Sequence, residues 1–255
     1  MVERSVMGMP VRVRGAGAAA EEVFAWLRWV DATFSTYRAG SEICRLDRGK
    51  LAPADAHPLV REVLARCETL RERTGGYFDA RAGGRLDPSG LVKGWAVDQA
   101  AALLDAAGCR RFCIDAGGDL VLRGGPWRVG IRHPHHRRKL AAAIAVSDAA
   151  VATSGTYERG AHIVDPRTGR PATDALSVTV VGPDLATADA YATAAFAMGD
   201  AGPAWTAALE GFDAMTILRG DRVLSTPGFV ALRGELSGSR PRRRAGRRSS
   251  ARLAA

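Results

Sequence analysis

The chain has 255 residues, of which 47% are hydrophobic and 25% charged, a composition that excludes collagen-like, low-complexity and wholly disordered proteins. Its net charge of +9 is typical of a nucleic-acid-binding protein, but seven of those charges are arginines within residues 237–255, which hold no acid. Residues 1–236 therefore carry a net charge of only +2. We expect one folded domain over 1–236 and a basic, disordered tail over 237–255. The charge then indicates no specific nucleic-acid partner, and at most a tail that touches anionic surfaces.

The first residues lack the apolar run of a secretory signal, and no 18 consecutive apolar residues occur anywhere that would predict a transmembrane helix. The four cysteines show no Cys-x-x-Cys spacing, which favours reduced, buried thiols over a disulfide framework. These observations predict a cytoplasmic protein without a transmembrane segment.

The predicted elements mix helices with strands, and their order is not a strict strand-helix-strand alternation. Helical spacing of apolar residues predicts helices over 18–35, 57–76, 93–108 and 185–199. Strands are predicted over 6–15, 111–124, 126–133, 139–148, 175–183, 213–220 and 222–230. The three strands between 111 and 148 are predicted to form a meander, and 161–171 to form a turn-rich loop. This order favours an α+β fold with a mainly antiparallel sheet.

Two patterns suggest other sites, and each has a simpler explanation. Gly15-x-Gly17-x-x-Ala20 matches a dinucleotide-binding fingerprint, but residues 34–42 read as a loop where that fold needs a second strand ending in an acid. His135 and His136 are adjacent in an arginine-rich stretch whose positive charge opposes a metal ion. A solvated turn between two strands is favoured there.

Several polar residues lie where chemistry is possible. Gly75 and Gly76 precede Tyr77-Phe78-Asp79, and Asp87, Gly90 and Lys93 follow at the predicted start of a helix. The carboxylates could hold a cation, and the lysine ammonium and a glycine backbone that a ligand can approach closely could hold an anion. The alternative is that these residues only form a turn and cap the helix. The solitary His162 could be a structural residue or a catalytic one. Residues Ala152–Gly155 are predicted to form a turn rich in hydroxyl groups.

Asp189 and Thr193 stand four residues apart on a predicted helix, so both side chains project from one face. A carboxylate and a hydroxyl suit Mg²⁺, which takes few protein ligands and keeps water or phosphate for the rest. The alternative is that Thr193 bonds back to its own helix and Asp189 caps the first turn.

Nine segments in a fixed order, from Met7 to about Met198, carry a family resemblance. They read MGMPV, D-x-x-FSTYR-x-x-SEICRL, TGGYFD, D-x-x-G-x-x-KGWAVD, D-x-GGDL, ATSGTY, HIVDPRTG, SVTVV and ADAYATAAFAMG. This succession resembles the ApbE family of FAD:protein FMN transferases. The resemblance implies a single ApbE-like (T-fold-like) domain that uses Mg²⁺ to transfer FMN from FAD to a Thr or Ser hydroxyl of an acceptor flavoprotein, releasing AMP.

The resemblance also assigns roles to particular positions. It implies His162 as the base, with Lys93 and Asp189 as further catalytic residues, and it implies Gly90, Asp189 and Thr193 as the Mg²⁺ ligands. The residues implied to bind FAD are Met7, Tyr37, Tyr77, Phe78, Asp79, Asp87, Lys93 and Ile163. The chain departs from the family in having Val92 before the lysine and Asp115 where an asparagine is frequent. Hydrolysis of FAD to FMN and AMP, and binding of FAD without catalysis, remain alternative functions.

Overall fold

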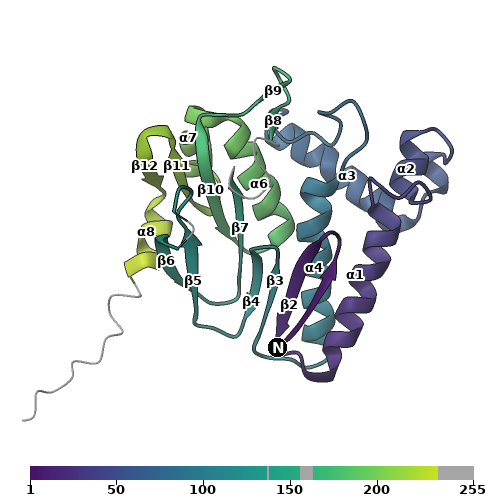
Figure 1. Cartoon of the computed structure of the whole chain (residues 1–255), viewed down its shortest axis with the longest axis horizontal. Coiled ribbons are helices and arrows are strands. Elements are labelled where there is room, and N and C mark those ends of the chain that lie inside the picture. The colour runs from purple at the N-terminus through teal and green to yellow at the C-terminus, as the bar shows by residue number, and fades with distance from the viewer. Residues whose placement is uncertain (137, 156–162, 235–255) are drawn as a thin grey trace, which may run out of the picture.

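The computed structural model describes residues 1–136, 138–155 and 163–234, which form a central sheet covered on both faces (Figure 1). The helices are α1 (Ala20–Phe34), α2 (Glu42–Asp47), α3 (Pro58–Arg73), α4 (Ser89–Ala106), α6 (Leu185–Ala197), α7 (Gly202–Ala207) and α8 (Pro227–Gly234). The strands are β1 (Val2–Val6), β2 (Met9–Arg14), β3 (Phe112–Ala116), β4 (Asp119–Arg123), β5 (Trp127–Arg132), β6 (Leu140–Val146), β7 (Ala149–Gly155), β8 (Val164–Asp165), β9 (Arg170–Pro171), β10 (Ala175–Gly182), β11 (Asp213–Leu218) and β12 (Arg222–Ser225).

The main sheet has eight strands in the order β1-β2-β3-β4-β7-β10-β11-β12. Every strand pair in the described part of the chain is antiparallel, which confirms the α+β class. A dinucleotide-binding fold needs neighbouring parallel strands, so the Gly15-x-Gly17 pattern is explained by the turn that leads into α1. Within the residues described, no helix is both long and apolar enough to cross a membrane.

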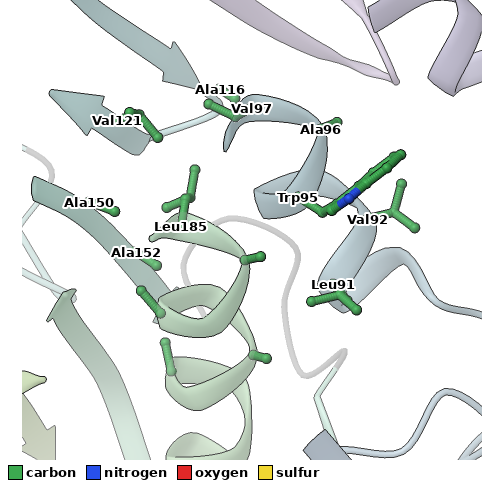
Figure 2. Close-up of a cluster of buried hydrophobic side chains, with 14 of the residues drawn as sticks. Leu91, Val92, Trp95, Ala96, Val97, Ala116, Val121, Ala150, Ala152 and Leu185 are labelled. Carbon is green, nitrogen blue, oxygen red and sulfur yellow. The ribbon is translucent and has the colours of Figure 1, made fainter. Parts of the chain in front are cut away.

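Helices α1, α4 and α6 share one hydrophobic core with one face of the sheet. In Figure 2, α6 lies beside α4 and next to β7, whose Ala150 and Ala152 face it. Both helices bury small or apolar residues on nearly every side, as expected for helices enclosed by neighbours. Their close approach depends on Gly94, because a Cβ there would lie 2.6 Å from the carbonyl oxygen of Leu185.

Strands β5 and β6 form a separate hairpin that packs with α8 against the opposite face of the sheet. The prediction of a simple meander over 111–148 is therefore wrong. After β4 the chain leaves the sheet for β5 and β6, and it returns as β7, which pairs with β4. Leu122, Val151 and Ile144 are buried between the main sheet and the β5–β6 hairpin. Burial of these apolar side chains therefore stabilises the hairpin on the face of the sheet instead of within it.

Two predicted single strands are hairpins. Residues 6–15 contain a turn at Met7-Gly8, where both φ angles are positive (55° and 74°), and this turn joins β1 to β2. Residues 111–124 turn in the same way at Gly117-Gly118 between β3 and β4. A two-residue turn of this kind matches the twist of the strands, so the ladder continues directly on both sides.

Four boundaries also differ from the sequence prediction. Helix α2 follows the predicted loop 34–42, and α8 replaces the second half of the strand predicted over 222–230. Residues 152–155, expected to be a turn, are the end of β7. Helix α4 begins at Ser89, so Lys93 lies in its second turn instead of at its start. The three-histidine stretch does join β5 to β6, and His135 and His136 are exposed as predicted.

Candidate functional site

A buried ion-pair cluster joins three elements that are distant in the sequence. The Lys93 ammonium of α4 pairs with Asp119 at the start of β4, and its Nζ lies 3.3 Å from Oδ2 of Asp189 in α6. Asp119 and Asp189 are only 3% and 4% exposed. Each partner on its own would be costly to bury, so the three groups depend on one another for their charges.

Each member of the cluster is held in place by the fold. Asp119 accepts a 2.9 Å hydrogen bond from the backbone N–H of Thr153 in the neighbouring strand β7. Burial opposes the charge on Lys93, but the attraction of Asp119 and Asp189 is larger and raises the pKa of Lys93 above its usual value. The ammonium therefore stays protonated at any physiological pH.

Thr193 lies one turn after Asp189 on α6, and its Oγ1 is 3.2 Å from the hydroxyl oxygen of Ser154 at the end of β7. The cap of α6 is Asp184, whose carboxylate accepts the N–H of Thr187 at 2.8 Å. The alternative in which Asp189 serves as that cap is therefore wrong. Asp189 and Thr193 both face groups of the site.

In the described part of the chain, the side-chain groups gathered here are the Asp119 and Asp189 carboxylates, which pair with Lys93, and the Ser154 and Thr193 hydroxyls, which contact each other one turn along α6 from Asp189. Gly90 lies three residues before Lys93 on the same side of α4. Among the described residues, no three His, Cys, Asp or Glu side chains gather closely enough to hold a metal by themselves. An ion here would need hydroxyl, backbone-carbonyl and water ligands besides carboxylate, and Mg²⁺ accepts such a set. The ion pairs of the Lys93 ammonium with Asp119 and Asp189 show that these carboxylates attract a positive charge.

Phe78 forms one wall next to Gly90. A Cβ on Gly90 would lie 3.2 Å from the Phe78 ring, so the ring lies against the first turn of α4. The position of Phe78 is set by Thr74 at the end of α3, whose Oγ1 donates to the Leu70 carbonyl at 2.8 Å and accepts the Phe78 N–H at 2.9 Å. The 77–79 turn is thus fixed to a helix end.

Tyr77 contacts the loop between β8 and β9. Arg167 donates to the Tyr77 hydroxyl at 3.0 Å, and its guanidinium lies 5.1 Å from the centre of that ring. Asp165 orders this loop by accepting the N–H of Arg167 at 2.9 Å and the hydroxyl of Thr168. Ile163, which precedes β8, is buried. The two predicted segments around Tyr77 and Ile163 are therefore neighbours through the Arg167 contact.

Of the other predicted FAD residues, Asp79 and Asp87 lie in the segment between α3 and α4, whereas Met7 and Tyr37 lie in other parts of the chain. Asp79 accepts the N–H of Arg81 at 2.7 Å and lines a cavity of about 340 Å³ beside α3, and Asp87 accepts the N–H of Ser89 at 3.0 Å before α4. Met7 is partly buried in the β1–β2 turn, while Tyr37 is 96% exposed. His162 lies outside the described residues.

Sequence reasoning missed three residues of this site. Asp119 enters the sequence analysis only as the last acid of the D-x-GGDL segment, with no role assigned to it. Ser154 had been assigned to a turn, and Arg167 had been given no role. In each case the missing information is a contact between elements that are far apart in the sequence.

The arrangement of motifs and elements agrees with the comparison of the chain with protein families. The model of the ApbE family matches residues 7–84 and 80–216. The chain belongs to the ApbE family. This ApbE chain is also 34% identical over 217 residues to the FAD:protein FMN transferase of Treponema pallidum (strain Nichols), which covers 72% of this chain and 59% of the relative. It is 37% identical over 130 residues to the enzyme of the same name from Vibrio cholerae, covering 45% and 39%.

Solved ApbE structures share this fold. The ApbE protein of Thermotoga maritima superposes with a TM-score of 0.82 at 22% identity, covering 91% of this chain and 98% of that one. The flavinyl transferase ApbE of Pseudomonas stutzeri, in its apo form, gives a TM-score of 0.77 at 26% identity, covering 91% and 96%. The ApbE chain described here thus spans nearly the full length of those structures, but only 59% and 39% of the two curated relatives.

Proposed function

We propose that this chain transfers FMN from FAD to a Thr or Ser hydroxyl of an acceptor flavoprotein and releases AMP. The observation that carries the proposal is the Lys93–Asp119–Asp189 cluster beside Thr193, found in a chain whose family relatives are named FAD:protein FMN transferases. A diphosphate is a polyanion, and a buried lysine with an oxygen-only cation site is suited to neutralising it.

We propose Gly90, Asp189 and Thr193 as the Mg²⁺ ligands and Lys93 as a direct contact for a phosphoryl oxygen. Magnesium, when bound, would neutralise charge on the phosphoryl oxygens. Met7, Tyr37, Tyr77, Phe78, Asp79, Asp87 and Ile163 are the residues proposed to bind FAD. Phe78 and Gly90 support this placement because they lie against each other, so the 77–79 turn adjoins the helix that carries Lys93.

In the reaction, the acceptor hydroxyl oxygen forms a bond to the phosphorus of the FMN half of FAD. The bond between that phosphorus and the bridging oxygen breaks, and AMP leaves with the electron pair. We propose that His162 takes the hydroxyl proton, a contribution worth roughly 10²–10⁴-fold in a general-base mechanism. Lys93, held protonated by its two carboxylates, stabilises the charge that develops on the phosphoryl oxygens.

The test is mass spectrometry of an acceptor flavoprotein incubated with FAD, Mg²⁺ and either the wild-type chain, His162→Ala or Asp189→Asn. We expect the wild type to add one FMN per acceptor and both variants to be slower by at least about 10². Asp200→Asn, which removes an exposed carboxylate, is the matched control and should behave as wild type. An acceptor that gains no FMN mass with the wild type contradicts the proposal.

The same experiment separates the two other functions. Steady release of FMN and AMP without acceptor would identify an FAD pyrophosphatase. Binding of FAD with no product of either kind, unchanged in Asp189→Asn, would identify a flavin-binding protein that is not an enzyme.

A further inference from the structure

Lys93 has two carboxylate partners, whereas the proposed magnesium site uses only one of them. Asp189 shares its helix face with Thr193, and Asp119 lies across from it on the sheet. The ammonium pairs with both carboxylates. A cation that binds Oδ2 of Asp189 would compete with Lys93 for that oxygen, and one that binds the other oxygen would still share the charge of the carboxylate with Lys93.

Asp119 is held through both of its carboxylate oxygens. One carboxylate oxygen accepts the N–H of Thr153 at 2.9 Å, and the other pairs with Lys93. The strand that carries Asp119 is paired on both sides, with β3 and with β7. Its carboxylate is therefore a fixed negative charge that remains available to Lys93 when Asp189 turns to another cation.

The charges of the cluster support the same conclusion. Two carboxylates and one ammonium sum to −1, which attracts a divalent cation, and a bound Mg²⁺ changes the sum to +1, which suits a diphosphate. Without the charge of Asp119, Lys93 and Asp189 would form a neutral pair. The ammonium would then have no other carboxylate partner in this cluster.

We propose that Asp119 is a positioning residue that retains the Lys93 ammonium, so that Asp189 can bind Mg²⁺ while Lys93 stays in the site. This inference rests on the magnesium site of the proposed function. It differs from two other roles for Asp119. As a direct magnesium ligand, Asp119 would matter whether or not Lys93 is present. As a purely structural acceptor for Thr153, it would matter for stability alone.

A double-mutant cycle distinguishes these roles. Mg²⁺ binding is measured by calorimetric titration of the full chain without FAD, using the wild type, Asp119→Asn, Lys93→Met and the double variant. The asparagine keeps a carbonyl oxygen for the Thr153 N–H and replaces the oxygen that faces Lys93 by an amide NH2, so it removes both the charge and the acceptor that hold the ammonium. We expect Asp119→Asn to weaken Mg²⁺ binding by about tenfold when Lys93 is present and by less than about threefold in the Lys93→Met background.

Two further variants complete the design. Lys93→Met alone should bind Mg²⁺ at least as tightly as the wild type, because Asp189 loses its competing ammonium. Asp119→Glu keeps the charge and should recover most of the affinity lost in Asp119→Asn. Asp105→Asn, on the same helix as Lys93 but half exposed and paired with Arg123, is the control and should leave Mg²⁺ binding unchanged. Thermal unfolding of each variant without Mg²⁺ verifies that it is folded, and Lys93→Met and Asp119→Glu still test the proposal should Asp119→Asn not fold.

An equal loss of affinity in both backgrounds would make Asp119 a magnesium ligand and overturn the proposal. Unchanged affinity in folded Asp119→Asn, weaker binding in Lys93→Met, or no recovery in folded Asp119→Glu would also overturn it. A wild-type chain that binds no Mg²⁺ overturns the metal part of the proposed function and this inference together. Absence of FMN transfer, with the cycle behaving as expected, would overturn the proposed reaction and leave the role of Asp119 intact.

Discussion

At the scale of single residues, the site contains one lysine with two carboxylate partners and a pair of hydroxyls one helical turn along α6 from Asp189. The side chain of Lys93 is 28% exposed, while the side chains of its carboxylate partners are only 4% and 5% exposed, so Lys93 is the most accessible member of the cluster. The Ser154 and Thr193 hydroxyls lie 3.2 Å apart and link β7 to α6. These contacts make Thr193 a suitable residue for separating a ligand role from a packing role.

Thr193→Val removes the hydroxyl and keeps the shape of the side chain, so we expect FMN transfer to slow by about 10- to 100-fold, with the largest loss at low Mg²⁺. Thr193→Ser keeps the hydroxyl and should remain within a few fold of wild type. The measurement is the initial rate of acceptor flavinylation as a function of Mg²⁺ concentration. A valine variant with the wild-type rate at every concentration would rule out Thr193 as a ligand.

At the scale of elements, the side chain of Asp98 adds hydrogen bonds to the packing that joins α4 to α6. Asp98 of α4 accepts the N–H groups of Leu185 and Ala186 at 2.9 and 2.8 Å, so it holds the first turn of α6. Asp189 follows within the next turn of that helix. The Asp98 contact therefore helps to set the distance between Lys93 and Asp189, together with the close approach of the helices at Gly94.

Burial raises the pKa of Asp98 from 3.8 to about 6, against the opposing effect of its two backbone hydrogen bonds. The folded chain thus keeps a proton that the unfolded chain has lost, and the contribution of Asp98 to stability falls as pH rises from about 4 to about 6. Relative to Asp98→Asn, the wild type should lose on the order of 2–3 kcal/mol of unfolding free energy across that range, at about 1.4 kcal/mol per pKa unit.

Urea unfolding of the wild type and Asp98→Asn at pH values between 4 and 7 measures this difference. The difference in unfolding free energy between the two proteins should change from about pH 4 through about pH 6 and level off near pH 7. A gap that is the same at every pH would show that Asp98 has its ordinary acidity in the folded chain.

At the scale of the whole molecule, most of the net positive charge and the residues of the candidate site lie in different parts of the chain. Seven of the nine net charges lie in residues 237–255, whereas Lys93 and its carboxylates belong to the nearly neutral part. We propose that residues 1–236 are the transferase domain and that 237–255 is a basic tail with no part in catalysis.

Deletion of residues 237–255 should leave the rate of FMN transfer within about twofold of wild type. It should also reduce sedimentation with anionic vesicles, because each arginine near such a surface contributes about 1 kcal/mol. The two measurements are made on the same protein, with neutral vesicles as the control. Loss of transfer on deletion would place part of the active site in the tail.

The sequence alone determined the α+β class, the cores of the main helices, and the family to which the order of the motifs points. It also placed Asp189 and Thr193 on one helix face, because the period of a helix is a local property that residues four apart reveal. The 77–79 turn and the Gly90–Lys93 segment were found in the same way, from short patterns within single segments.

Only the tertiary structure decided that Asp119 and Ser154 belong to the site, and that β5 and β6 leave the main sheet. Lys93, Asp119 and Asp189 come from α4, β4 and α6, and no local pattern records which elements lie side by side. That choice depends on how apolar faces are buried, such as the backbone approach at Gly94 and the second core beneath the β5–β6 hairpin. The cluster exists because packing brings its three charges within reach of one another.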